Sequence, residues 1–358
     1  KQTVDFKKAI HYFTKAANQN QPNAQFILGS IYYEGKYAVR DISKAMYYLS
    51  LAAKQNYPNA QFNLGMIYYE GKFVARDIDK AIHYLSLAAN KNHPQAQCKL
   101  GLIYYEGRYL PRNINKAIQY FSLAASQNLI QAQFNLGIIY VKNQYVKRDI
   151  DKAFHYFTLA SNQNDSRAQF CLGLLYFERE KSIEDIKKGT YYIILSSKNG
   201  NRFANFAHGF LLHEGKFIKR NIQDAIHYYK EASSFNIKYA KNNLGIIYKN
   251  GCEGIEKRVG NAIVYLEEAI NQMNDILSMY NLAHIYMYDE TIENNLDRSI
   301  ELLLKSYEFI HSRYLLYLAL IKKFGFDITS IMKEVNKILK KEKKFLSEKI
   351  CQKIKDIQ

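Results

Sequence analysis

The sequence contains no tryptophan, only four cysteines and no long apolar run. Its cysteines, which show no metal-binding spacing such as C-x-x-C, are Cys98, Cys171, Cys252 and Cys351. This pattern argues against a zinc-binding protein, and unpaired thiols favour a reducing compartment, so we expect a cytoplasmic protein. Because no apolar stretch reaches the roughly 18 residues that a bilayer requires, the sequence predicts no membrane-spanning helix.

Acidic residues are scarce relative to basic ones. The chain has 50 Lys and Arg against 33 Asp and Glu, which gives a formal charge of +17. Such a charge would suit nucleic acid or an anionic membrane, although net charge reports non-specific attraction rather than fold. The excess includes a tail at 322–358, where eleven Lys accompany five acids. That tail is either a basic amphipathic helix for a membrane or, the interpretation we favour, a polar cap on the fold.

One octet at first looks like a phosphate-binding loop. In GMIYYEGK, from Gly65 to Lys72, two glycines precede a lysine, but five residues separate the glycines and Phe73 replaces the Ser or Thr that would hold magnesium. Versions of the octet recur, with the first glycine every 36 residues, at Gly29, Gly65, Gly101, Gly137, Gly173, Gly209 and Gly245. A fixed period of this size is typical of a solenoid, and a nucleotide site would not be needed seven times.

Each repeat predicts two helices. Apolar residues between Ala60 and Tyr68 follow helical spacing, and Gly71 is suited to end that helix. Asp77 fits the N-cap of a second helix. Because a glycine inside a helix costs about 1 kcal/mol relative to alanine, we interpret the seven repeated glycines as structural notches where helices approach closely.

The repeat resembles the Sel-one-like repeat family, which is related to the tetratricopeptide repeats. The matching residues of one unit are Ala60, Leu64, Gly65, Tyr68, Gly71, Asp77, Lys80, Ala81, Tyr84, Ala88 and Ala89. The resemblance covers about Asp5 to Ile270 and implies an all-α fold, a right-handed superhelical α-solenoid of antiparallel helix pairs. It also implies concave and convex faces and a scaffold or adaptor role without catalysis.

The repeats divide the chain into four expected parts. The second helix of a leading repeat lies at 1–20, so we expect its first helix upstream of Lys1. Seven repeats follow at 21–270, then a degenerate eighth repeat at 271–320 and a Lys-rich helical cap or tail at 321–358. Terminal repeats are expected to depart from the pattern because they end the stack.

Repeated polar residues offer no catalytic arrangement. One repeat position holds histidine in four units, at His11, His83, His155 and His227. Ligands of one metal must converge within bonding distance, so histidines two repeats apart predict no metal site. The recurring Arg76-Asp77 pair starts a helix and fits a cap. No nucleophile with its base and no carboxylate pair stands out, so the sequence predicts no enzyme, no cofactor and no small-molecule substrate.

One surface of the first helices varies from repeat to repeat, while the packing positions barely change. We predict that this surface is a solvent-facing stripe lining a concave groove. Its expected partner-binding residues are Asn23, Asn59, Asn63, Gln95, Lys99, Gln131, Asn135, Arg167 and Asn243. The alternative is a neutral surface that is free to drift.

The favoured function is a monomeric, non-catalytic scaffold that binds a protein or peptide in this groove. One alternative is an accessory region of a larger signalling kinase, ubiquitin-ligase or endoplasmic-reticulum quality-control assembly. Another is electrostatic attachment to nucleic acid or an anionic membrane through the Lys-rich tail, which would weaken with salt.

Overall fold

The computed structural model describes residues 6–142, 144–179, 182–252, 254–293 and 295–324. Within these ranges it contains 18 α-helices and no β-strand. The chain divides into two compact units, Lys1–Leu175 and Tyr176–Gln358, which we call unit 1 and unit 2. Most of the predicted Lys-rich cap or tail, 325–358, lies outside the described residues.

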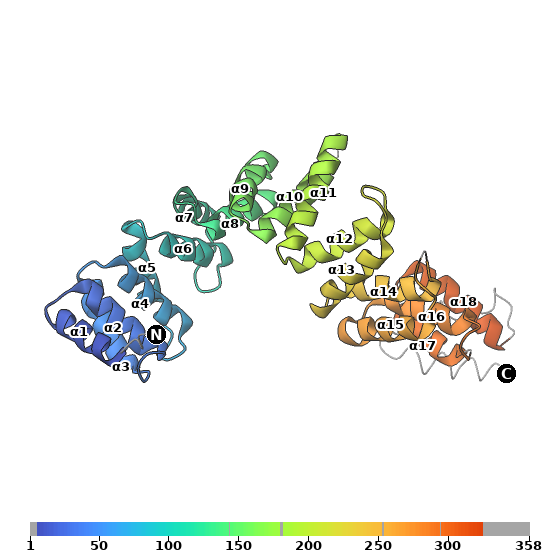
Figure 1. The fold of residues 1–358 in the computed structure, drawn as a ribbon, viewed down its shortest axis with the longest axis horizontal. Coiled ribbons are helices and arrows are strands. Elements are labelled where there is room, and N and C mark those ends of the chain that lie inside the picture. Colours follow the sequence, from blue (N-terminus) through green and yellow to red (C-terminus); the bar gives the residue numbers. More distant parts are fainter. Residues whose placement is uncertain (1–5, 143, 180–181, 253, 294, 325–358) are drawn as a thin grey trace. The chain divides into compact units, whose positions relative to one another are not determined.

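The helices of each unit can be followed by label and colour in Figure 1. Unit 1 contains α1 (Phe6–Asn18), α2 (Pro22–Glu34), α3 (Ile42–Lys54), α4 (Pro58–Glu70), α5 (Ile78–Asn90), α6 (Pro94–Glu106), α7 (Ile114–Ser126), α8 (Ile130–Val141), α9 (Ile150–Asn162) and most of α10 (Ser166–Arg179). Unit 2 contains α11 (Ile183–Lys198), α12 (Arg202–Glu214), α13 (Ile222–Ser234), α14 (Lys238–Asn250), α15 (Val259–Met273), α16 (Ile276–Tyr288), α17 (Leu296–Lys305) and α18 (Ile310–Phe324).

Consecutive helices pack in pairs. In unit 1 the most extensive contacts join α2 with α3, α4 with α5, α6 with α7 and α8 with α9, which are the two helices of each repeat. The second helix of one repeat also packs on the first helix of the next, as α3 does on α4. Short connections reverse the chain between neighbours, so the all-α solenoid of antiparallel helix pairs predicted from the period is confirmed.

The helix boundaries follow from a few special residues. α4 begins with Pro58, whose missing N–H is tolerated in the first turn. It ends at Gly71, whose φ of 63° is a left-handed conformation that suits glycine. α5 begins after Asp77, whose side chain accepts a hydrogen bond from the Lys80 N–H at 2.9 Å. The predicted C-cap and N-cap are therefore confirmed.

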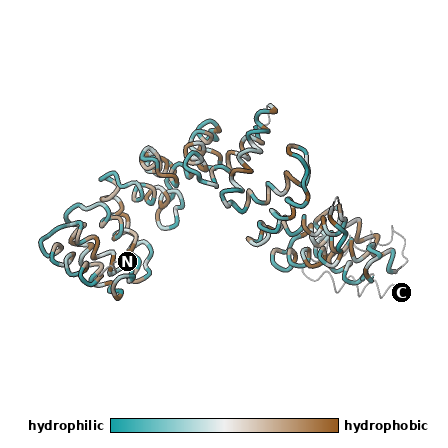
Figure 2. The backbone as a smooth tube through the Cα atoms, viewed as in Figure 1, coloured by the Kyte–Doolittle hydropathy of each residue, from teal (hydrophilic) through white to brown (hydrophobic). Residues whose placement is uncertain are grey.

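Small and branched residues form the core. Hydrophobic and hydrophilic positions alternate along the helices (Figure 2), and the apolar side of each helix is buried. In one repeat the buried residues include Ala60, Leu64, Ile67, Ala81, Leu85 and Ala88. Within the described residues, no helix is both long enough and apolar enough to cross a membrane.

The repeated glycines lie where the two helices of a repeat touch. A Cβ atom placed on Gly101 in α6 would lie 2.8 Å from Cδ1 of Phe121 in α7. One placed on Gly65 in α4 would lie 2.7 Å from Cγ of Leu85 in α5. Comparable crowding occurs at Gly29, Gly137, Gly209 and Gly245. Any side chain at these positions would force the second helix or its side chains to move.

Unit 2 follows the repeat less closely. In α16, Ala283 occupies the position of the repeated glycine and is fully buried. The connection after α14 contains an antiparallel bridge between Cys252 and Ile255. Cys98, Cys171 and Cys252 are free cysteines, and Cys351 lies outside the described residues.

Candidate functional site

The predicted stripe maps onto the first helices of the repeats. In unit 1 its residues lie on α2, α4, α6, α8 and α10, and in unit 2 Asn243 lies on α14. We call the unit 1 part the first-helix face. Its first position is exposed in all five repeats, at Asn23, Asn59, Gln95, Gln131 and Arg167.

The second position of the first-helix face is half-buried. Asn63, Lys99 and Asn135 occupy it in three successive repeats. Lys99 places its Nζ 3.7 Å from the ring centre of Tyr69 in the preceding repeat, and burial lowers the pKa of its ammonium. The expectation that Lys99 faces solvent is therefore wrong, because its long side chain lies across a neighbouring aromatic ring.

Asn63, Asn135 and Asn243 are also less open than the stripe prediction implied. The Asn63 Nδ2 lies 3.5 Å from Oγ of Ser30 in the preceding repeat, and Nδ2 of Asn135 is buried without a partner among the described residues. In unit 2, Asn243 is half-buried and lies near the Tyr229 hydroxyl. Three of the predicted asparagines therefore lie partly within the stack.

Polar contacts also tie the first position of the face to the next repeat. The Tyr57 hydroxyl donates to Oδ1 of Asn23 at 3.1 Å. One repeat later, Nε2 of His93 lies 3.1 Å from Oδ1 of Asn59, and Nδ1 of His93 accepts the Ala96 N–H at 3.2 Å. Both contacts require the neutral tautomer that carries its proton on Nε2, and burial lowers the pKa of His93 in the same sense.

The third position of the face is aliphatic in four of the five repeats. It holds Ser30 first, and then Met66, Leu102, Ile138 and Leu174. The three middle residues are half-buried, and 48% of Leu174 is exposed. The face thus combines a row of amide-rich positions with a row of accessible aliphatic side chains. The residue at this position changes from repeat to repeat, but it stays apolar across these four repeats.

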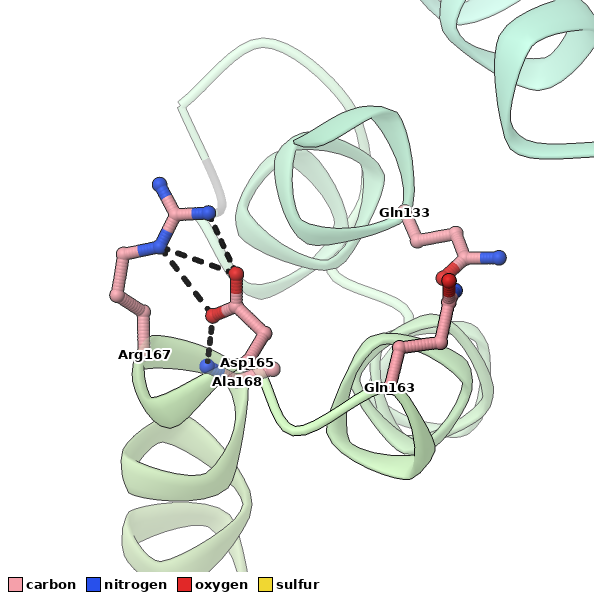
Figure 3. A network of polar contacts seen from close by, with 5 residues as sticks. All are labelled: Gln133, Gln163, Asp165, Arg167 and Ala168. Carbon is pink, nitrogen blue, oxygen red and sulfur yellow. Dashed lines mark hydrogen bonds and ion pairs between the residues drawn. The ribbon is translucent and has the colours of Figure 1, made fainter. Parts of the chain in front are cut away.

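Arg167 departs from the amides that precede it. Figure 3 shows its guanidinium turned toward Asp165, and the Nη2–Oδ2 distance is 2.6 Å. The same carboxylate accepts the Ala168 N–H at 2.9 Å and so caps α10. Arg167 also lies over the Phe134 ring of the preceding repeat, with its Cζ 4.4 Å from the ring centre. Its charge is therefore partly neutralised within the fold.

Buried glutamines link neighbouring helices beneath this face. In the repeat that Figure 3 shows, Gln163 donates from Nε2 to Oε1 of Gln133 at 2.9 Å. The equivalent bonds join Gln55 to Gln25 and Gln127 to Gln97, each at 2.8 Å. The recurrence of glutamine at 25, 61, 97, 133 and 169 was the sequence signal for this network, which sequence reasoning missed.

The recurring arginines cap first helices. Arg76 donates from Nε to the Tyr69 carbonyl at 3.1 Å and from Nη2 to the Glu70 carbonyl at 3.2 Å. Its guanidinium also lies 5.5 Å from the ring centre of Tyr109 in the next loop. A glutamate also recurs near the end of the first helices. Burial and the nearby Glu70 carboxylate raise the pKa of Tyr33, which lies in the preceding repeat.

The histidines of the shared repeat position lie on the second helices and are exposed at 11, 83, 155 and 227. Their rings pack edge-on against the following tyrosine, as His83 does on Tyr84 at 5.3 Å. The described residues contain no group of three or more His, Cys, Asp or Glu side chains placed to hold a metal ion.

The Sel1 repeat pattern matches residues 1–21, 22–57, 58–93, 94–129, 130–165, 166–201, 203–234 and 276–308. The chain belongs to the Sel1 repeat family. Sel1 repeats and the related tetratricopeptide-like repeats generally mediate protein–protein interactions. Residues 235–275 fall outside the matched segments, although α14 and α15 still pack as a helix pair there.

Two solved structures share the Sel1 repeat fold. A Sel1 repeat protein from Oxalobacter formigenes is 24% identical with a TM-score of 0.64, and the match covers 86% of this chain and 89% of that one. The protective antigen c5321 of uropathogenic Escherichia coli, which displays an SLR fold, is 22% identical with a TM-score of 0.57, covering 91% and 77%. None of the curated proteins compared with the chain matches it. These likenesses establish the fold.

Proposed function

We propose that this Sel1 repeat protein is a non-catalytic scaffold whose first-helix face binds an extended segment of a partner protein. The observation that carries the proposal is the row of accessible aliphatic side chains from Met66 to Leu174, which lies beside exposed amides on the same helices. Aliphatic pockets would take alternate side chains of an extended chain, and amide groups would bond its backbone.

The burial of the second position sharpens the proposal. Because Asn63 and Lys99 contact residues of the preceding repeat, the partner would contact the exposed amides of the first position and the apolar side chains of the third most directly. Leu102 and Ile138 therefore become the central anchors, with Gln95 and Gln131 beside them. We expect the protein to act as a monomer in a reducing, cytoplasmic compartment. We also propose that the first-helix face lines the concave groove that the family resemblance implies.

The test compares partner binding by the intact chain and by surface variants. Leu102→Arg with Ile138→Arg should weaken the affinity of a recovered partner at least tenfold, about 1.4 kcal/mol. Asn63→Arg with Asn135→Arg is expected to act in the same direction.

The matched control, His83→Arg with Gln119→Arg, adds the same charge to exposed positions of the second helices and should change affinity by less than about twofold. Equal loss in both pairs of variants, with unchanged helicity, would place the partner elsewhere. Deleting 322–358 should leave affinity within a few-fold, and loss of binding on that deletion would make the tail the site.

A further inference from the structure

A surface hollow in unit 1 lies at the C-terminal end of α6, between two loops that connect the helices of successive repeats. Its volume is about 410 Å³, and its lining residues are Tyr105, Glu106, Arg108, Arg112, Gln144 and Tyr145. The residues come from the end of α6, the loop that follows it, and the loop after α8. The hollow is therefore built by two neighbouring repeats.

Its walls are held in place by Arg112. The Arg112 Nε donates to the Tyr105 carbonyl at 2.9 Å, and Nη2 donates to the Glu106 carbonyl at 3.1 Å. The third nitrogen, Nη1, donates to the Tyr145 hydroxyl, and the guanidinium lies 4.7 Å from the Tyr145 ring centre. All three nitrogens thus have partners, and the two aromatic walls are fixed relative to each other at a centroid distance of 6.5 Å.

The charge of these two loops differs from that of the equivalent loops earlier in the chain. Residues 34–41 and 70–77 each contain two basic and two acidic side chains. By contrast, 106–113 contains two basic residues and one acid, and 142–149 contains three basic residues and one acid. Much of the change comes from Lys142, which stands where neighbouring repeats have Glu70 and Glu106.

Three cations of these two loops are available, and one of them, Arg108, lines the hollow. Arg108, Lys142 and Lys147 are exposed and make no hydrogen bond or ion pair with any residue that the structure describes. The acid of the second loop is already engaged, because Asp149 caps α9 and pairs with Lys152 at 3.2 Å. The balance at this site is therefore an excess of unneutralised positive charge beside a hollow.

We propose that the hollow and its neighbouring cations bind an acidic stretch of a partner polypeptide at the C-terminal end of α6. Arg108 and Lys147, on opposite loops, would each bind a carboxylate, and Tyr105 and Tyr145 would cover the apolar part of the segment. Charge-assisted hydrogen bonds from Arg and Lys to carboxylates are the contacts that such a surface offers.

The geometry favours a polypeptide over a nucleic acid. Arg112 already covers one face of the Tyr145 ring, which leaves less of that ring for a base to stack on. The free cations are separated on two loops, a spacing that suits several single carboxylates along an extended chain.

The experiment measures binding of a fluorescein-labelled peptide that alternates glutamate and glycine to the full chain, by fluorescence anisotropy. Arg108→Glu with Lys147→Glu should lower its affinity at least tenfold. The matched control is Lys36→Glu with Lys72→Glu, which makes the same change of charge on the two earlier loops and should lower affinity by less than threefold. Raising the ionic strength should weaken wild-type binding because exposed charges are screened within about 10 Å at 0.1 M salt.

Three results would overturn the proposal. The first is an equal loss in the control pair, which would mean that overall charge attracts the peptide. The second is no measurable binding of the acidic peptide to the wild-type chain at low salt. The third is tighter binding of an oligothymidylate of equal charge, lost in the Arg108/Lys147 variant, which would identify a nucleic-acid site. Circular dichroism of each variant checks that the helices persist, and Arg108→Lys should retain binding.

Discussion

In unit 1 the same polar contact returns at the repeat interval, whereas several polar contacts of unit 2 occur at one place. The bonds between Gln25 and Gln55, Gln97 and Gln127, and Gln133 and Gln163 are near-copies of one another. Unit 2 instead has a buried Lys241 that pairs with Glu268 at 2.8 Å, and a buried Asn242 that accepts from Nδ2 of Asn281 at 2.8 Å. A contact that recurs in each repeat belongs to the packing that all repeats share. A contact that occurs once depends on the particular residues at that place in the chain.

The largest expected effect tests a requirement shared by both units, the glycine at the helix contact. Gly101→Leu should lower the free energy of unfolding by about 3 kcal/mol, because the side chain would overlap the Phe121 ring. Gly101→Ala should cost about 1 kcal/mol. Gly260→Ala, in the first turn of α15 where no atom lies within 4 Å of the new Cβ, should instead stabilise by about 0.5 kcal/mol. Urea unfolding measures all three, and equal effects at both alanine sites would refute the packing argument.

The next effect tests a contact that occurs once in unit 2. Glu268→Ala should destabilise the chain by about 2 kcal/mol, because it leaves the buried Lys241 ammonium with Gln272 as its remaining hydrogen-bond partner. Half-exposure of Glu268 keeps the cost below that of a fully buried pair. Replacing both partners, with Lys241→Met and Glu268→Leu, should recover most of the loss. The exposed control Glu231→Ala should change the free energy of unfolding by less than about 0.5 kcal/mol. Thermal melting measures both variants, and equal losses of stability in Glu231→Ala and Glu268→Ala would contradict the prediction.

A smaller, stabilising effect is expected where the recurring contact of unit 1 fails. Gln61 is buried like its equivalents, but Lys91 stands where the other repeats have a glutamine, and Oε1 of Gln61 has no hydrogen-bond partner among the described residues. Lys91→Gln should add the missing bond and stabilise by about 1 kcal/mol. The reverse exchange, Gln127→Lys, should destabilise by a similar amount. Chemical denaturation of the two variants gives the comparison, and effects of the same sign would show that the bond does not matter.

The smallest effect concerns pH. Burial lowers the pKa of His93 in unit 1, and it lowers the pKa of His208, His213 and His284 in unit 2. As pH falls below the ordinary value of about 6.5, the unfolded chain takes up protons before the folded chain does, so stability falls until the folded-state pKa values are reached.

With three such histidines, unit 2 should lose more protection than unit 1 between about pH 7 and pH 5. Amide hydrogen exchange of the full chain, corrected for intrinsic exchange rates, measures the protection of both units in one sample. His93→Asn, which keeps an N-cap acceptor, should reduce the change in unit 1. Greater loss of protection in unit 1 than in unit 2 would contradict the assignment.

The sequence was sufficient for the features that one repeat contains within itself. Gly71 and Asp77 identify the ends of two helices because left-handed backbone and N-capping each require particular residue types. The repeated glycines could be explained by close helix packing because their cost in a helix demands compensation. Such features depend on neighbours within about one repeat of the chain.

Contacts between repeats were harder to predict. The stripe periodicity grouped Lys99 with the variable positions, but it could not show that the side chain reaches Tyr69, 30 residues earlier. The proximity of Glu70 to Tyr33 depends on the register between neighbouring helices in the same way. The binding roles of the stripe residues remain predictions, since a surface becomes a site through a partner that the chain itself does not contain.

The missing partner of Gln61 also has a mechanical consequence. Gln25 bonds both the Ala17 carbonyl and Gln55 and so ties three successive helices, whereas Gln61 bonds only the Ala53 carbonyl. A tensile load on the two ends of a solenoid passes through its helix pairs in series, so the pair with the fewest ties yields at the lowest force. Among the four helix pairs from α2 to α9, α4 and α5 should separate first, and exchanging residue 91 should move the point of rupture to another repeat.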